Sequence, residues 1–222
     1  MCGRYALTLP HEAMVQVFAA APSNDLPEGP RFNVCPTTQV PVVTAAEGER
    51  RLRPMRWGFL PHWYKSPTDG PLLINARAET VAEKPAFRTA IRERRCLIPA
   101  TGFYEWTKAD GQRLPWYFHP REGEALAFAG LWQDWGPEDL PTCAIVTCTA
   151  GSTMAEIHHR EPVTLDPADW ALWLGEAGHG AATRMRAAPE GRLTRYRVST
   201  KVNSNRVEGP DLIDPLIDED DR

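Results

Sequence analysis

The sequence predicts a single α+β domain with a mixed, barrel-like β core flanked by short helices. Three observations point to this fold class. Many short runs rich in β-branched and aromatic residues are separated by Gly, Pro and Asp turns, which is typical of strands. Only a few stretches have helical periodicity, and each is short. The 222 residues contain no internal repeat and no linker, and a chain of this length usually forms one domain with a sizeable core.

The first half of the chain is expected to alternate short strands with turns and one amphipathic helix. Pro10 stands where that helix would begin, because proline is tolerated in the first helical turn. The apolar residues that follow at helical spacing, and so should face the core, are Met14, Val17, Phe18 and Ala21. In order, we expect a strand at 4–8, this helix, turns at 22–31, a polar loop with apolar anchors at 31–38, hairpin strands at 40–44 and 52–57, and an aromatic loop at 57–64.

The second half is expected to consist mostly of strands. An apolar run at 72–74 leads into the polar residues 75–80, which are either site residues at the end of a buried strand or local helix caps. Asp110-Gly111 predicts a tight hairpin turn. The remaining elements are, in order, a basic helix at 85–95, strands at 96–99, 101–106, 114–118, 126–132 and 142–149, a helical turn at 154–157, a helix at 167–174, a strand at 193–199 and a polar loop at 201–210.

Composition places the chain among ordinary globular proteins. Hydrophobic residues make up 42% and charged residues 24%, which is average usage. There is no apolar run of membrane length and no basic-then-apolar leader, so we expect a cytoplasmic protein without a membrane span. The five cysteines include no C-x-x-C pair, which argues against a disulfide framework or a zinc ribbon. No P-loop or dinucleotide glycine motif is present, and we expect neither a metal nor a cofactor.

Charge is distributed unevenly along the chain. Residues 208–222 hold seven acids against one arginine, which predicts a flexible, solubilising acidic tail. Residues 50–95 hold eleven basic residues and four acids. A basic segment in an acidic protein is compatible with a local site for a polyanion. A solvated charged face is the commoner meaning of such a run, and the sequence leaves both open.

The N-terminal residues Met1-Cys2-Gly3-Arg4-Tyr5 offer the most unusual chemistry. If Met1 is removed, Cys2 carries an α-amine and a thiol on adjacent carbons, with ordinary pKa values of about 7.7–8.0 and about 8.5. A useful fraction of each is then expected to be deprotonated near neutral pH, so that the thiol can act as a nucleophile with its own amine as base. The pair can also condense with an aldehyde to form a thiazolidine ring. The alternative is that Cys2 is a packing residue, as most free cysteines are.

Two further stretches hold candidate acid–base groups. Glu105 lies between two large aromatic residues of a predicted strand, where it is either exposed or partly buried with a raised pKa. The adjacent His158 and His159 point in different directions and lack the spacing of a metal-binding helix. We interpret one histidine as an acid–base candidate and the other as exposed.

Six sequence blocks, taken together and in order, resemble one family. They are MCGRY at the N-terminus, RFNVCPT at 31–37, WGFLP at 57–61, NARAET at 75–80, CLIPATGFYEW at 96–106 and HHREP at 158–162. They are similar to the SRAP family (SOS response-associated peptidase domain), the abasic-site processing proteins. The resemblance covers residues 1–207, which we take as the domain, and leaves 208–222 as the tail.

The resemblance implies binding of single-stranded DNA that contains an abasic site, or of a junction between single- and double-stranded DNA. The family's N-terminal cysteine captures the ring-opened sugar aldehyde as a stable thiazolidine DNA–protein crosslink, which shields the lesion during the DNA damage response. Lyase-like Schiff-base chemistry and a cysteine autopeptidase or self-release activity are also implied. We expect a monomer that is associated with the nucleoid when bound to DNA.

Matched residue by residue, the resemblance assigns roles to side chains of this sequence. Cys2 would be the nucleophile, and Asn75 would orient its amine or the sugar. Glu105 would be the general acid–base group in Schiff-base formation and ring closure. His158, from its place in the H-x-R-x-P block, would assist ring opening or crosslink reversal. The implied DNA-binding residues are Arg4, Arg77 and Arg160 at the flanking phosphates, and Asn33, Trp106 and Thr149 along the DNA path.

One position departs from the family pattern. Glu161 stands where a hydrophobic residue, often Met, usually separates the Arg and the Pro of the last block. The departure concerns the packing of the loop that carries His158, and not the histidine itself.

Two other classes of function remain open. An N-terminal nucleophile amidohydrolase, such as a glutaminase domain, also begins Met-Cys-Gly and uses the free amine as base. This chain instead continues with Arg4-Tyr5, where glutaminases usually have an apolar Ile, and it has the basic segment. A non-catalytic module for single-stranded DNA would explain the arginines and tryptophans but would leave Cys2 and Glu105 without a role. Aldehyde capture uses both, because dehydration of the carbinolamine needs a general acid.

Overall fold

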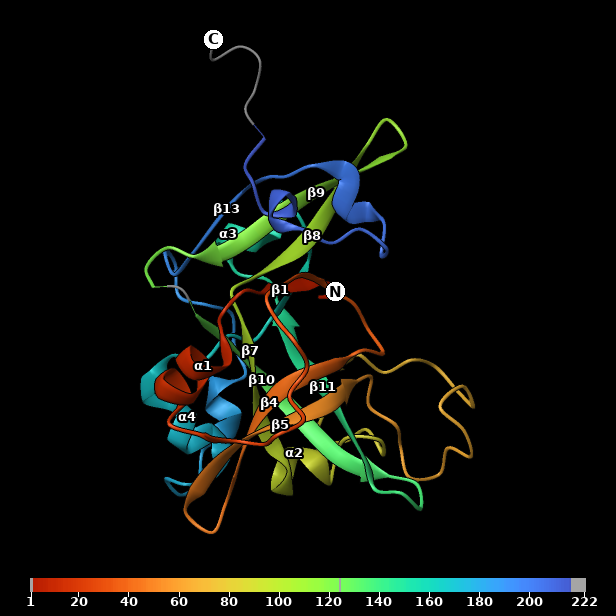
Figure 1. Cartoon of the computed structure of the whole chain (residues 1–222), viewed down its shortest axis with the longest axis vertical. Coiled ribbons are helices and arrows are strands. Elements are labelled where there is room, and N and C mark those ends of the chain that lie inside the picture. The colour runs from red at the N-terminus through yellow and green to blue at the C-terminus, as the bar shows by residue number, and fades with distance from the viewer. Residues whose placement is uncertain (1, 124, 217–222) are drawn as a thin grey trace.

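The computed structural model of the chain describes residues 2–123 and 125–216. Within these ranges, a larger and a smaller β-sheet are flanked by short helices, and the smaller sheet lies with the N-terminus in the upper half of Figure 1. The predicted α+β class is therefore confirmed. No helix in these ranges is long and apolar enough to cross a membrane.

The larger sheet curls into a ring. Its strands are β2 (Ala21–Pro22), β4 (Gln39–Ala46), β5 (Glu49–Trp57), β6 (Asn75–Arg77), β7 (Arg95–Ala100), β10 (Leu126–Trp135), β11 (Leu140–Thr149) and β12 (Arg160–Pro162). Their order is β12-β11-β10-β7-β4-β5-β2, with β6 added on β11. A parallel pairing of β5 with β11, at Arg56–Thr142 and Trp57–Cys143, closes five of these strands on themselves. The core is thus barrel-like, as predicted, although the ring is not a complete barrel.

The smaller sheet brings a distant strand to the N-terminus. It consists of β1 (Tyr5–Leu7), β3 (Arg31–Val34), β8 (Gly102–Ala109), β9 (Gln112–Pro120) and β13 (Leu193–Arg197). Their order is β13-β9-β8-β1-β3. Phe103 on β8 lies opposite Tyr5 on β1, and the Tyr104 N–H donates to the Arg4 carbonyl (3.0 Å). Glu105, the next residue on β8, is thereby placed beside the first residues of the chain.

Two tight turns form the hairpins that the sequence predicted. Glu47 and Gly48, with φ of 53° and 80°, join β4 to β5, and Asp110 and Gly111, with φ of 51° and 75°, join β8 to β9. Positive φ at both central residues is what a type I′ turn requires, and its twist matches that of the strands. Both predicted hairpins are confirmed, with longer strands than expected.

Short helices cover the ring. They are α1 (His11–Phe18), α2 (Ala90–Glu93), α3 (Ser152–Ala155) and α4 (Pro167–Leu174), with 3₁₀ turns η1 (Ala181–Arg184), η2 (Thr200–Asn203) and η3 (Pro210–Leu212). Met14 and Phe18 of α1 are buried as predicted, but Val17 is 43% exposed and Ala21 lies in β2. The helix ends early because Ala19 adopts the left-handed conformation (φ 48°). The predicted apolar stripe is therefore wrong at two positions.

Several other segments differ from the sequence-based expectation. Residues 31–34, expected as a loop, form β3, and residues 160–162 form β12. Both are short strands whose pairing depends on a neighbour more than on their own propensity. The polar residues 75–77 form β6 instead of following a strand, and the basic helix expected at 85–95 is reduced to α2 and preceding turns.

Residues 208–216, the described part of the predicted acidic tail, pack against the domain. Within residues 208–216, Leu212 is fully buried and the Ile213 carbonyl accepts a hydrogen bond from the Tyr196 hydroxyl (2.7 Å). The prediction of a flexible tail beginning at 208 is wrong for this segment, because its apolar residues have places in the core. The rest of the predicted tail, residues 217–222, lies outside the described residues.

Aromatic contacts fix the N-terminal strand against the ring. The Tyr5 ring lies edge-on to Trp57 and Phe128, with centroids 5.2 and 5.7 Å apart. All three side chains are fully buried, and burial of one large apolar side chain contributes about 1.5–3 kcal/mol. The position of β1, and of the residues just before it, is therefore set by the core.

Candidate active site

Cys2 is fully buried directly before β1. Burial raises the pKa of its thiol well above the usual range, and the nearby Glu105 carboxylate raises that pKa further. In this chain, which carries Met1, the thiol is therefore protonated near neutral pH. The ordinary pKa of a cysteine had predicted a useful fraction of thiolate, and the difference arises because the side chain is desolvated.

Asn75 holds the backbone of Cys2. Its Nδ2 amide donates to the Cys2 carbonyl oxygen at 2.9 Å. Its Oδ1 atom is buried and accepts no hydrogen bond from the described residues. β6 fixes this side chain, because Asn75 is paired with Ile145 on β11. An open acceptor on a side chain already bonded to Cys2 is suited to an N–H group of that residue.

Glu105 is buried in β8, with only 4% of its surface exposed. The sequence had left its burial open. Its charge acts on the Cys2 thiol, so the two groups are close in space although far apart in sequence. A buried carboxyl beside a potential nucleophile is the arrangement that general acid–base catalysis uses.

The adjacent histidines have different environments. His158 is half-buried, and its Nδ1 lies 3.0 Å from the backbone nitrogen and 3.1 Å from the carbonyl oxygen of Arg160. These contacts fix the orientation of the ring. His159 is exposed, and its ring stacks on that of His158 with centroids 4.4 Å apart. The proximity of His158 is the main cause that lowers the pKa of His159.

A cavity of about 490 Å³ brings several of the predicted residues together. We call it the Glu105 cavity. Its lining holds three cationic side chains, one carboxyl group and one imidazole, which suits a polyanionic ligand that also needs acid–base chemistry. The lining residues are Gly3, Arg4, Glu105, Trp106, Lys108, Arg113 and His158.

A second cavity of about 490 Å³ contains Asn75 and the exposed Arg77, and we call it the Asn75 cavity. Asn75 lines this cavity and is also bonded to Cys2, so Cys2 is connected to both cavities. Further lining residues include the aromatic side chains of Trp63, Tyr64 and Phe87 and the cation of Lys84.

Glu79 fastens two of the predicted DNA-binding residues. Its carboxylate accepts hydrogen bonds from the Arg160 guanidinium at 2.7 and 2.9 Å and from the N–H and hydroxyl of Thr149 at 3.2 Å each. The hydrogen bonds from Arg160 are the main cause that lowers the pKa of Glu79 to about 2. The sequence left open whether Glu79 is a site residue or a local helix cap, and it did not indicate these partners.

Arg160 is buried, and it also donates to the Thr147 carbonyl at 2.7 Å. A buried guanidinium needs such partners to offset its lost hydration. Arg160 and Thr149 thus belong to the framework around the site, and direct DNA contact by either one stays a prediction.

Arg4, Asn33 and Trp106 form a second network at the Glu105 cavity. Arg4 donates to Asn33 Oδ1 at 2.7 Å, and the buried Asn33 donates to two carbonyls in the segment 202–207 at 3.0 and 2.6 Å. The Trp106 indole N–H donates to the side chain of Asn203 at 2.6 Å. These three predicted DNA-binding residues are thus tied to the C-terminal part of the chain, which the sequence did not indicate.

Glu161, the departure from the family pattern, is buried and hydrogen-bonded. Its carboxylate accepts the N–H groups of Gly151 (2.8 Å) and Ala188 (2.7 Å). Burial raises its pKa. Gly151 is the N-cap residue of α3, the helix that leads to His158, so Glu161 holds the segment in which that histidine lies.

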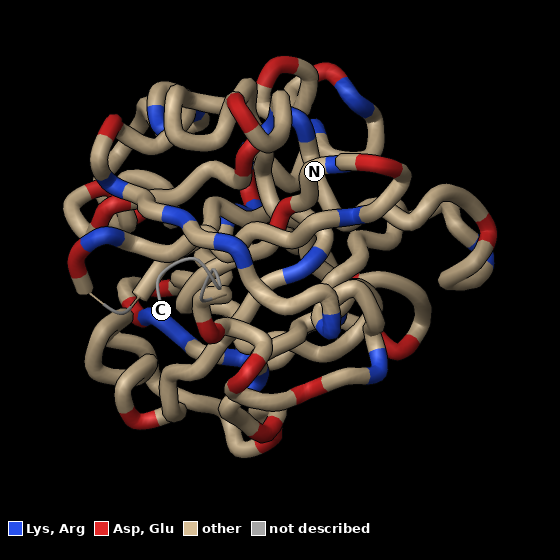
Figure 2. Tube along the Cα trace, turned by 90° about the horizontal axis from the view of Figure 1, so that it is seen from above, with Lys and Arg blue, Asp and Glu red and all other residues tan. Residues whose placement is uncertain are grey.

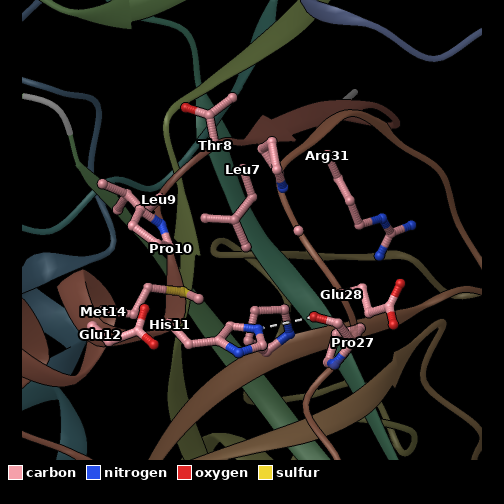
Figure 3. A pocket seen from close by; sticks show the side chains of 13 residues that line it. Leu7, Thr8, Leu9, Pro10, His11, Glu12, Met14, Pro27, Glu28 and Arg31 are labelled. Carbon is pink, nitrogen blue, oxygen red and sulfur yellow. Dashed lines mark hydrogen bonds between the residues drawn. The ribbon is translucent and has the colours of Figure 1, made fainter.

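A third cavity, of about 340 Å³, lies beside α1 (Figure 3). Across it, His11 Nε2 is hydrogen-bonded to the Pro27 carbonyl at 3.0 Å. None of the predicted site residues lines this cavity, so it is separate from the candidate site.

Two arginines of the basic segment 50–95 are paired with acids from outside it. Arg50 pairs with Glu176 (2.7 Å), and Arg53 pairs with Asp134 (3.6 Å). Figure 2 shows acidic and basic residues interspersed over the chain trace. Among residues 2–123 and 125–216, there is also no group of three or more His, Cys, Asp or Glu side chains that could hold a metal ion.

Comparisons with known proteins agree with the resemblance. The family model described as SOS response associated peptidase (SRAP) matches residues 1–205. "Abasic site processing protein YoqW" of Bacillus subtilis is 34% identical over 224 residues, which are 96% of this chain and 99% of the relative. "Abasic site processing protein YedK" of Escherichia coli is 29% identical over 97% of this chain and 100% of the relative. "Abasic site processing protein HMCES" of Pongo abelii is 28% identical over 97% of this chain and 76% of the relative.

Solved structures share the fold. A protein from Bacteroides thetaiotaomicron has a TM-score of 0.84 and 22% identity, over 97% of this chain and 100% of that chain. A phage-related protein from Bordetella bronchiseptica has a TM-score of 0.71 and 30% identity, over 89% of this chain and 94% of that chain. Since the family model matches residues 1–205 and so covers nearly the whole chain, this chain belongs to the SOS response associated peptidase (SRAP) family.

Proposed function

We propose that this protein senses abasic sites in single-stranded DNA and captures them covalently through Cys2. Relatives that match nearly all of the chain are named abasic site processing proteins, which supports the lesion as substrate. The observation that carries the chemistry is the hydrogen bond from Asn75 to Cys2, beside the buried Glu105 whose charge acts on the thiol.

Removal of Met1 would make Cys2 competent. While Met1 is attached, the nitrogen of Cys2 belongs to a peptide bond and cannot attack a carbonyl. Once Met1 has been removed, the α-amine of Cys2 has a pKa of about 7.7–8.0 and is partly neutral at about pH 7.5. Asn75 Oδ1, which accepts no hydrogen bond from the described residues, can then accept an N–H of that amine and orient its lone pair.

Capture then proceeds in balanced steps. The Glu105 carboxylate first takes a proton from the α-ammonium form of Cys2, and the neutral amine adds to the sugar aldehyde to give a carbinolamine. Glu105, as a carboxylic acid, protonates the hydroxyl group, and water leaves to give an iminium ion and a carboxylate. The Cys2 thiol passes its proton to that carboxylate while the sulfur bonds to the iminium carbon. The products are a thiazolidine and one water, with Glu105 again protonated.

The high pKa of the buried thiol fits this order of events. A thiol that stays protonated does not compete with the amine for the aldehyde in the first step. It gives up its proton to Glu105 only as its sulfur bonds to the iminium carbon, so one residue serves as acid for the dehydration and as base for ring closure.

We assign ring opening of the sugar to His158, which shares the Glu105 cavity. An imidazole can take the proton of the hemiacetal hydroxyl and deliver it to the ring oxygen as the C–O bond breaks, which gives the aldehyde and a free hydroxyl group. The same groups around the Cys2 thiol would serve crosslink reversal and the autopeptidase step that the family name suggests.

An abasic site has no base to recognise, so we propose that affinity comes from the flanking phosphates. Arg77 is exposed in the Asn75 cavity, and Arg4 lines the Glu105 cavity. Arginine suits phosphates because of its fork of donors. We propose that residues 1–207 bind single-stranded DNA, or a junction with a duplex, as a cytoplasmic monomer, and that Arg160, Asn33, Trp106 and Thr149 shape the DNA path.

The test uses an oligonucleotide with a single abasic site. Incubation with the purified protein is expected to give a heat-stable band of higher mass on a denaturing gel. Cys2→Ala should abolish this band and leave binding to intact single-stranded DNA nearly unchanged, because the thiol is buried and contributes little to the charged surface.

If Cys2→Ala crosslinks to abasic DNA as well as wild type does, the thiazolidine proposal is wrong. Turnover of glutamine without any reaction with DNA would instead favour the N-terminal nucleophile amidohydrolase. Binding of DNA without a covalent product, by wild type freed of Met1, would leave the non-catalytic binding module as the better description.

A further inference from the structure

We propose that Lys108 and Arg113, at the free end of the β8–β9 hairpin, form a phosphate-binding pair for the DNA strand next to the Glu105 cavity. The inference rests on the proposed function, since it names where that DNA would lie. Neither residue belongs to the sequence blocks on which the site assignments were based.

The hairpin brings the two cations together at the cavity. Lys108 and Arg113 are directly opposite each other across β8 and β9, and both line the Glu105 cavity together with His158. Side chains at directly paired positions point to the same face of a sheet. Both are exposed, so a ligand in the cavity can reach them without rearrangement of the core.

Neighbouring contacts hold Arg113 in place. Its guanidinium carbon lies 4.7 Å from the centre of the Trp106 ring. The Trp106 indole donates to Asn203 Oδ1 at 2.6 Å, and Asn203 Nδ2 donates in turn to the Arg113 carbonyl at 3.0 Å. A guanidinium that rests on an aromatic face keeps the donors at its edge available for a phosphate.

The charge balance of the pair favours an anion. No acidic side chain among the described residues forms an ion pair with Lys108 or Arg113, whereas Arg50, Arg160 and Lys201 all have such partners. Like charges directly opposite each other on neighbouring strands are destabilising. A phosphate bound between the two cations would relieve this repulsion.

The two nearby acidic residues do not neutralise this pair of cations. Asp110 lies in the turn of the hairpin, and Glu105 is buried in the strand. The position of the pair at the same cavity as Glu105 suits a phosphate one or two nucleotides from the lesion. Such a contact would orient the abasic sugar, which offers no base for recognition.

The test is the salt dependence of binding to intact single-stranded DNA, measured by fluorescence anisotropy between about 50 and 200 mM NaCl. In Lys108→Gln/Arg113→Gln, the slope of log K against log salt should become shallower by about 0.7, because each neutralised phosphate on a single strand contributes about 0.7.

The matched control is Arg51→Gln/Arg92→Gln, which removes the same charge from exposed positions on β5 and α2. α2 and the β4–β5 hairpin lie at the opposite end of the molecule from the β8–β9 hairpin (Figure 1). This control should leave the slope unchanged within about 0.3.

The proposal is overturned if the hairpin variant and the control change the slope equally, or if wild type does not bind single-stranded DNA. A different result is expected if the phosphate-binding pair exists but the proposed function is wrong. Wild type would then bind DNA with a slope that depends on the hairpin pair, yet form no covalent product with an abasic site.

Discussion

At the scale of single residues, Cys2 and Glu105 constrain each other. Burial and the Glu105 charge together keep the Cys2 thiol protonated. A protonated, buried thiol is a poor target for oxidants and alkylating agents, since the thiolate is the reactive species. The nucleophile is therefore protected until an electrophile has entered the site.

Glu105→Gln tests this coupling. The side chain keeps its size but can no longer donate or accept the catalytic proton, so crosslinking to abasic DNA should slow by about 10²–10⁴-fold. Affinity for intact single-stranded DNA should not fall. The variant also removes a negative charge from the thiol, so the pKa of Cys2 should fall in part, although burial still holds it high.

Two measurements check this prediction. Gel-based kinetics give the crosslinking rate, and the pH dependence of alkylation of the protein freed of Met1 gives the pKa of the thiol. Crosslinking at the wild-type rate would remove Glu105 from the mechanism. A slow rate with an unchanged thiol pKa would mean that the carboxylate does not act on Cys2 as proposed.

At the scale of elements, α3 and the residues after it depend on contacts from outside the helix. α3 has only four residues, too few for a helix to be stable alone. Glu161 accepts the N–H of Gly151 at its start, and Arg195 on β13 bonds to the Thr153 carbonyl and to Glu156. These contacts hold the segment that carries His158.

Glu161→Leu should destabilise the fold by about 1–2 kcal/mol and slow crosslinking. The substitution restores the usual hydrophobic character at this position but leaves two backbone N–H groups without an acceptor, and each such loss costs about 1–3 kcal/mol. Removal of a buried carboxylate offsets part of this cost. Urea denaturation gives the free energy of unfolding.

Glu156→Gln is the matched control for this element. Glu156 is 72% exposed in its side chain and pairs with Arg195, and exposed ion pairs contribute at most about 1 kcal/mol. A Glu161→Leu variant as stable as wild type would show that the carboxylate does not hold α3. Glu161→Gln keeps one acceptor oxygen, so its free energy of unfolding should lie between those of wild type and Glu161→Leu.

At the scale of the whole molecule, the C-terminal part of the chain completes the smaller sheet and the site. The segment 202–207 receives hydrogen bonds from Arg4 and Asn33, and residues 208–216 cover the sheet behind it. The first and last parts of the described chain thus stabilise one another.

Truncation after Val207 should therefore destabilise the protein. It removes Leu212, which is fully buried, and loss of a buried leucine side chain costs about 2–5 kcal/mol. A protein of this size loses about 2–4 °C of melting temperature per kcal/mol, so calorimetry should show a fall of about 5 °C or more. A truncated protein that melts at the wild-type temperature would support the tail boundary at 208 that the sequence suggested.

Local chemistry in the sequence was enough for much of the fold and for the main candidates. Turn residues at Glu47-Gly48 and Asp110-Gly111 identified both hairpins, because positive φ is required at fixed positions there. The unusual residue types at Cys2 and Glu105, and the order of the sequence blocks, identified the family. Each of these features is a short local run of sequence or depends on residue type alone.

Only the tertiary structure decided which of these residues meet and which are available. β1 and β8 are adjacent in the smaller sheet although they are far apart in the sequence, and this pairing places Glu105 beside Cys2. The buried Arg160 is held by Glu79, and Asn33 by the segment 202–207. Burial and partner choice depend on contacts between residues far apart in the chain. The sequence alone therefore determined which groups could carry the chemistry. Long-range packing determined the protonation of Cys2 and which arginines are buried and paired or exposed.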